Sequence, residues 1–120
     1  MKRESLCMNG ISPASIRLIL LNVEACVDNL AGIGVEADLI LFHPYDGGRW
    51  GFDRMPLEAG VRYLKYLTAR MSSFRNIWWS LANEYDFLRE LKPEYWDTFT
   101  HTVSREMILI LIYVPFILIQ

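Results

Sequence analysis

The sequence predicts an α/β fold in which parallel strands alternate with helices. Three observations support this prediction: residues 23–33 carry apolar side chains at helical spacing, two short apolar runs follow at 37–42 and 76–82, and a helical pattern separates these runs. Strands that alternate with helices indicate βαβ units, whose strands pair in parallel through right-handed crossovers. Both strands are therefore expected to end at the same edge of one sheet.

The first predicted unit is a helix followed by a strand. The apolar residues of the helix are spaced by three or four positions and share one face: Val23, Val27, Leu30 and Ile33. The apolar run at 37–42 predicts a strand that is buried on both faces. Its loop begins at His43 and extends to about Met55, because Pro44 and the glycines after it cannot continue a ladder.

The second predicted unit repeats this order. Pro56 suits the first turn of a helix, and the apolar stripe of that helix is regular: Leu57, Val61, Leu64, Leu67 and Met71. Residues 76–82 predict the next strand. Pro93 opens a last helix, and the apolar side of that helix is also clear: Tyr95, Trp96, Phe99 and Val103.

A polar cluster follows each predicted strand. Residues 43–46 read His-Pro-Tyr-Asp, and residues 83–86 read Asn-Glu-Tyr-Asp. In parallel α/β folds the chemistry lies at the carboxyl ends of the strands. Two polar clusters at that position therefore predict an active-site edge.

Glu84 is the best candidate for a catalytic acid. It ends a hydrophobic strand between aromatic residues, so it is expected to be partly desolvated, which favours the protonated form that a general acid needs. The amide of Asn83 can donate to a sugar hydroxyl. From the chemistry alone, a solvated loop carboxylate or a partner in a helix N-cap explains Glu84 equally well.

Two blocks of sequence resemble a known family. WSLANEYD at 79–86 resembles the fourth-strand motif of clan A glycoside hydrolases, in which an Asn-Glu pair ends the strand. EADLILFHPYD at 36–46, with RWGF at 49–52, is similar to an apiosidase-like branch of that clan. The Asn-Glu pair alone is weak, whereas two blocks separated by a helix of the right length are specific. The resemblance covers about 23–106 and implies a partial (β/α)8 TIM barrel, units three and four of a fold that needs ~250 residues.

The resemblance also implies roles for individual residues. Glu84 would be the acid/base, and Asn83 would bind the hydroxyl next to the anomeric carbon. Four further residues are expected to line the sugar cleft: His43, Tyr45, Asp46 and Trp50. The alternatives remain open: Asp46 shapes a turn, His43 bonds the backbone, and Trp50 caps its loop against the core.

The second carboxylate of a retaining glycosidase is not expected within this chain. The nucleophile lies about 5–5.5 Å from the acid/base, and in the resembling clan it comes from the seventh strand. Glu90, Glu94 and Asp97 lie on or near the last helix and are poor substitutes. The chain alone is therefore expected to be inactive as a hydrolase, and the alternative interpretation is a pseudogene-like remnant with no catalytic function.

The two ends resemble the family only in another reading frame. One shifted reading of the codons for 107–117 permits DPYSHLRSIH, and the same shift over 8–21 permits EWDFTRFNPAYFA. We therefore expect 1–22 and 107–120 to be frame-shifted segments that flank a barrel portion at 23–106. As written, open sheet edges and a β-branched apolar tail predict a molten or aggregating product.

Composition argues against several other functions. The formal net charge of −2 does not suggest a nucleic-acid partner. Cys7 and Cys26 form no framework, His43 and His101 have no ligand spacing, and so neither a metal nor a cofactor is implied. A membrane anchor at 107–120 is a third hypothesis, but its 14 residues fall short of the ~18 of a span. The expected partner is a carbohydrate substrate of the complete barrel.

Overall fold

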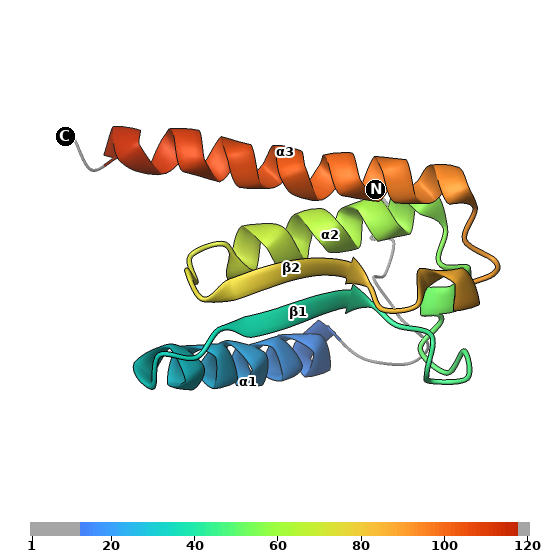
Figure 1. The fold of residues 1–120 in the computed structure, drawn as a ribbon, viewed down its shortest axis with the longest axis horizontal. Helices are drawn as coiled ribbons and strands as arrows, with labels where there is room; N and C mark the ends of the chain where they lie inside the picture. The colour runs from blue at the N-terminus through green and yellow to red at the C-terminus, as the bar shows by residue number, and fades with distance from the viewer. Residues whose placement is uncertain (1–12, 118–120) are drawn as a thin grey trace.

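The computed structural model describes residues 13–117, with side chains described for 14–108. Three α-helices, two strands and two short 3-10 helices follow one another in this part of the chain (Figure 1). Their order is α1 (Pro13–Gly32), β1 (Ala37–Phe42), η1 (Phe52–Arg54), α2 (Leu57–Met71), β2 (Ile77–Ala82), η2 (Tyr85–Phe87) and α3 (Pro93–Ile117). The predicted alternation of helices and strands is confirmed.

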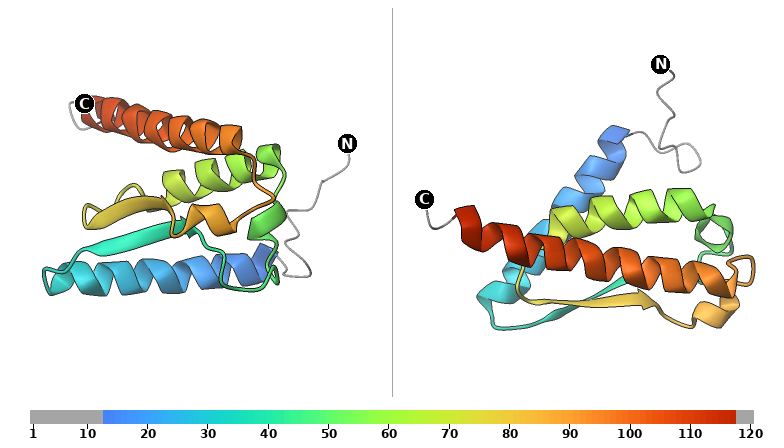
Figure 2. Two further views of the ribbon diagram at one scale, coloured as in Figure 1. Left: turned by 45° about the vertical axis from the view of Figure 1, so that its right-hand side comes forward. Right: turned by 90° about the horizontal axis from the view of Figure 1, so that it is seen from above.

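The two strands form a parallel sheet, as predicted. Their register pairs Ala37 with Ile77 at the start and Phe42 with Ala82 at the end. Figure 1 shows both arrows pointing the same way, so that the loops after them meet at one end of the molecule. Seen from above, the strands lie along one edge and the helices lie on the other side of them (Figure 2). This arrangement makes the carboxyl edge of the sheet the place to look for a site.

The strand and α2 boundaries agree with the predicted ones to within a residue, but α1 is longer. It begins at Pro13 instead of residue 23, because no helix breaker lies between them and proline suits a first helical turn. The helix α3 begins at Pro93 as predicted and continues to Ile117. Within residues 13–117, no helix is long and apolar enough to cross a membrane.

Phe42, at the end of β1, is the centre of the core and is fully buried. Its ring stacks on Phe99 of α3 with centroids 5.0 Å apart. It also contacts Tyr63 of α2 edge-on at 5.5 Å and Trp96 of α3 at 5.7 Å. One side chain therefore joins the sheet to both helices that follow β1.

The expectation that β1 is buried on both faces is wrong. Asp38 is exposed, and Ile40 is 42% exposed. The physical reason is that the described helices cover one face of the sheet. On the open face, Ser80 donates a hydrogen bond to Asp38 at 2.5 Å, and the Trp78 indole donates to Glu36. The open face therefore carries polar pairs between neighbouring strands, together with exposed Ile40.

Polar contacts fix α1 against the rest of the fold. Arg70 of α2 donates two hydrogen bonds to Glu24 of α1, at 2.5 and 3.1 Å, and they lower the pKa of Glu24. The Asn76 amide donates to the carbonyl oxygens of Val27 at 2.9 Å and Val35 at 3.2 Å. The start of β2 is thereby tied to the end of α1.

Gly60 of α2 packs directly against Phe99 of α3. A Cβ at Gly60 would lie 2.6 Å from Cζ of the buried Phe99. We therefore expect Gly60→Ala to lower the free energy of unfolding by about 1–3 kcal/mol through overpacking, although alanine favours a helix by ~1 kcal/mol. Urea denaturation at low micromolar concentration measures this change.

Gly32→Ala is the matched control for this substitution. Gly32 ends α1, and a Cβ there has no neighbour within 4 Å. Its replacement should leave stability unchanged or raise it slightly. If both substitutions had the same effect, the crossing at Gly60 would not be close enough to exclude a methyl group.

Candidate active site

Three of the predicted site residues meet at the carboxyl edge of the sheet. The Tyr45 hydroxyl, in the loop after β1, donates a hydrogen bond to Oε2 of Glu84 at 2.5 Å. Nδ2 of Asn83 donates to the same hydroxyl at 2.9 Å. Asn83 thus donates a hydrogen bond to Tyr45, and Tyr45 donates one to Glu84. All three side chains can exchange hydrogen bonds with a hydroxyl group.

Glu84 has an unusual backbone conformation. Its φ of 47° and ψ of 53° lie in the left-handed region, and within residues 13–117 no other non-glycine residue has a positive φ. Its carbonyl accepts a hydrogen bond from the Phe87 amide at 3.0 Å, which closes the turn into η2. Non-glycine residues avoid this region because of a steric cost, and such outliers cluster at functional sites. The backbone conformation therefore makes Glu84 a candidate functional residue independently of its sequence motif.

The expected desolvation of Glu84 is not found. Glu84 is exposed, and so is Tyr85 beside it, at 61%. The reason is that the Tyr85 ring packs edge-on against Trp96 at 5.7 Å instead of covering the carboxylate. The polar contact that Glu84 does make, with Tyr45, supplies a hydrogen-bond donor instead of an apolar wall.

The bond to Glu84 also affects Tyr45. This hydrogen bond, followed by partial burial and the negative charges of Glu84 and Asp86, raises the pKa of Tyr45 above its ordinary value. Tyr45 therefore stays a neutral donor toward a carboxylate acceptor. Sequence reasoning placed Tyr45 in the cleft, but only the structure shows that it contacts Glu84.

Asp46 is bonded to its own loop. Its Oδ1 accepts from the Gly48 amide at 3.0 Å and its Oδ2 accepts from the Trp50 amide at 2.8 Å. Burial opposes ionisation of this carboxyl, but the Trp50 and Gly48 amides, together with the charge of His43 and the Asp46 amide, outweigh it and hold the pKa of Asp46 below its ordinary value. Both oxygens thus shape the turn, which is the alternative role that the sequence left open.

His43 lies beside the cluster, and Trp50 lies in the loop that Asp46 holds. The His43 ring is 6.4 Å from that of Tyr45 and 5.5 Å from that of Phe52, centroid to centroid. The guanidinium of Arg49 lies over the Trp50 ring, 5.0 Å from its centroid. Their contacts with a sugar remain predictions. In the described part of the chain, no three His, Cys, Asp or Glu side chains gather to hold a metal.

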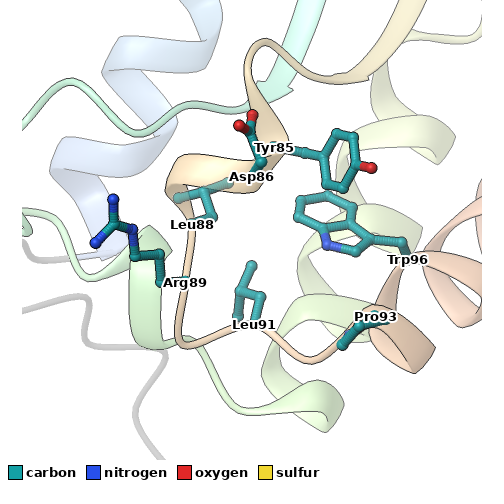
Figure 3. A pocket seen from close by; sticks show the side chains of 7 residues that line it. All are labelled: Tyr85, Asp86, Leu88, Arg89, Leu91, Pro93 and Trp96. Atoms are coloured by element: carbon teal, nitrogen blue, oxygen red, sulfur yellow. The ribbon is translucent and has the colours of Figure 1, made fainter.

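A pocket that the sequence analysis missed lies next to this cluster. It is lined mainly by the loop after Glu84, including Tyr85, Asp86 and Arg89, and by Trp96 (Figure 3). Trp96 could be predicted only as part of the apolar side of α3. Nothing in its helical spacing indicated that it also faces this loop.

Comparison with solved structures relates the chain to one protein of similar sequence. This is a crystal structure described as a "putative glycoside hydrolase" from Bacteroides vulgatus ATCC 8482, with 53% identity and a TM-score of 0.70. The match covers 72% of this chain and 17% of that protein, so this chain corresponds to a small part of it. No family model matches the chain, and no curated protein does. The chain is therefore an α/β unit similar to a fragment of a glycoside hydrolase.

Replacing Glu84 tests the left-handed conformation. Glu84→Gly and Glu84→Ala both remove the bond to Tyr45, but only glycine accepts this backbone without a steric cost. We expect the glycine variant to be more stable than the alanine variant by about 1 kcal/mol in urea denaturation. At Glu90, where φ is not positive, the order should reverse because glycine loses more backbone entropy. An alanine variant at Glu84 that is as stable as the glycine variant would refute the conformation.

The hydrogen bonds of Asp46 predict acid sensitivity. Since its folded pKa is depressed, its contribution to stability is present above the unfolded pKa of ~3.9 and is lost as pH falls through the lower folded value. Asp46→Asn should therefore lower stability at pH 6 and reduce the loss between pH 6 and pH 3, measured by urea denaturation. The same substitution at Asp97, exposed on α3, should leave both quantities at their parental values.

Proposed function

We propose that residues 23–106 are part of a clan A glycoside hydrolase barrel of the apiosidase-like branch, and that Glu84 is its general acid/base. The cluster of Asn83, Tyr45 and Glu84 is the observation that carries this proposal. It lies at the carboxyl ends of two adjacent parallel strands, where barrel enzymes hold their catalytic groups. The substrate class is a carbohydrate with an O-glycosidic bond.

The two oxygens of Glu84 would have different roles. Tyr45 occupies Oε2, so Oε1 is the oxygen that carries the proton to the leaving group. The Tyr45 hydroxyl fixes the carboxyl plane and stabilises the charge that remains after protonation of the glycosidic oxygen. Asn83 holds the Tyr45 hydroxyl through one amide hydrogen, which leaves its carbonyl oxygen and second amide hydrogen for a sugar hydroxyl.

The rest of the reaction would depend on the complete barrel. A retaining mechanism needs a carboxylate nucleophile about 5–5.5 Å from Glu84, and the proposal takes it from a barrel strand outside this chain. Asp46 is not a substitute, since both of its oxygens hold the loop. His43, next to Tyr45, and Trp50, farther along the same loop, would border the sugar.

Burial along the helices supports the boundaries of this barrel portion. Leu18 and Ile19 precede it and are 67% and 55% exposed, whereas Val27 within it is 4% exposed. Ile108, just beyond its other end, is 55% exposed. These three exposed apolar side chains fit segments translated in a shifted frame, although Leu20 and Met107, also outside 23–106, pack against the core. The share of the chain that matches the solved structure, 72%, is similar to the share within these boundaries.

A chimera tests the role of Glu84. Residues 23–106 would replace the matching segment of the Bacteroides vulgatus protein, and hydrolysis of polysaccharides and aryl glycosides would be measured. We expect the chimera to be active and Glu84→Gln to lower kcat by about 10²–10⁴-fold, as for loss of a general acid. For aryl glycosides with a dinitrophenolate leaving group, which needs no proton, Glu84→Gln should lower kcat much less. The isolated 120-residue chain should show no turnover.

Glu90→Gln in the same chimera is the matched control. Glu90 is an exposed carboxylate six residues along the same loop, and its replacement should leave kcat unchanged. Full activity of the Glu84→Gln chimera on glycosides with poor leaving groups would refute the acid/base role. An inactive chimera of an active parent would instead favour the inactive remnant.

A further inference from the structure

The loop after Glu84 borders an open pocket that has no role in the proposed reaction. Residues 85–93 curve around a hollow of about 310 Å³, and Trp96 of α3 forms part of its wall. Figure 3 shows Tyr85 and Trp96 together on one side of this hollow, with Leu88 and Leu91 along the loop, while the guanidinium of Arg89 extends from the other side of the loop. Small-molecule pockets begin at about this volume, so the hollow suits a single ring.

The apolar part of the pocket wall is fixed in position. Leu88 and Leu91 are almost completely buried, at 1% and 5% exposed. Trp96 packs edge-on against Phe99 and Tyr85, each with centroids 5.7 Å apart. An aromatic face held by the core is the platform on which the C–H face of a pyranose can pack without reorganisation of the protein.

The rim of the pocket is polar. Asp86 and Arg89 are exposed, and neither makes a hydrogen bond or an ion pair with any residue in the described part of the chain. A carboxylate accepts and a guanidinium donates hydrogen bonds. Because the two charges are opposite, they suit a neutral polyol better than an anion.

We propose that this pocket binds one neutral pyranose ring of a carbohydrate chain, beside the glycosidic bond that Glu84 would protonate. The inference rests on the proposed function for its ligand class, because carbohydrate is the substrate proposed there. The position follows from the chain itself: Tyr85 and Asp86 line the pocket and directly follow Glu84. Trp96 and Tyr85 would hold the ring face, and Asp86 and Arg89 would bond its hydroxyls.

Tryptophan indole signals provide the test. The chain labelled with ¹⁵N at tryptophan, and the chimera in parallel, would be titrated with cellobiose, xylobiose and digalacturonic acid. We expect saturable shifts of the Trp96 indole with the neutral disaccharides. The Trp78 indole should not move, although Trp78 is 64% exposed on the open face of the sheet. Shifts of Trp78 without Trp96, or tighter binding of digalacturonic acid, would overturn the assignment.

Two substitutions at the rim keep the test independent of folding, since both residues are exposed. Arg89→Ala and Asp86→Asn should each weaken binding about tenfold, as expected for loss of a hydrogen bond to a charged group. Arg62→Ala, exposed on α2 outside the pocket, should not weaken it. Undiminished binding in both rim variants would overturn the proposal.

Glu84→Gln separates this proposal from the proposed function. Glu84 does not line the pocket, so this variant should bind the disaccharides as the parent chain does. Binding that depends on Arg89, in a chimera whose hydrolysis ignores Glu84, would retain the pocket and refute the acid/base role. Hydrolysis that depends on Glu84, with no shift of the Trp96 indole signal, would retain the acid/base role and refute the pocket.

Discussion

The in-register parallel pairing of β1 with β2 is the constraint on which the candidate site depends. It aligns Phe42 with Ala82, so both strands end at the same level and release their loops at one edge of the sheet. Tyr45 and Glu84 are 39 residues apart, yet they share a hydrogen bond there. A register shift of one residue would turn one partner of the Asp38–Ser80 pair to the opposite face, because side chains alternate along a strand.

The core holds this sheet edge in place from one side only. Phe42 ends β1 in full burial between α2 and α3, and the close approach of those helices depends on the absence of a side chain at Gly60. The opposite face of the sheet carries exposed Ile40 and Trp78. A strand in a closed barrel is covered on both faces, whereas in the described residues this two-stranded sheet has one open face. The expectation that the chain as written is molten or aggregates remains a prediction.

In the candidate site, two loops fixed by local contacts hold an exposed carboxylate. Asp46 fixes the first loop through backbone amides, and the left-handed backbone at Glu84 turns the second loop into η2. Between them, Tyr45 supplies the hydrogen bond that orients the exposed carboxylate. Precise placement of a reactive group requires this kind of support from surrounding residues. The pocket beyond Tyr85 extends the same edge toward α3 and adds the Tyr85 and Trp96 rings.

The sequence by itself determined the alternation of helices and strands, the limits of β1 and α2, and the coincidence of two polar clusters at one sheet edge. These features follow from the local spacing of apolar residues and from the residues that end a strand. Only the tertiary structure decided that Asp46 bonds its loop, that Tyr45 bonds Glu84, and that β1 keeps an open face. The Tyr45–Glu84 bond and the open face depend on neighbours brought together by another strand or helix, of which spacing along the chain carries no record. The Asp46 bonds are local, but the sequence left two roles open for this residue and only the loop conformation distinguished them.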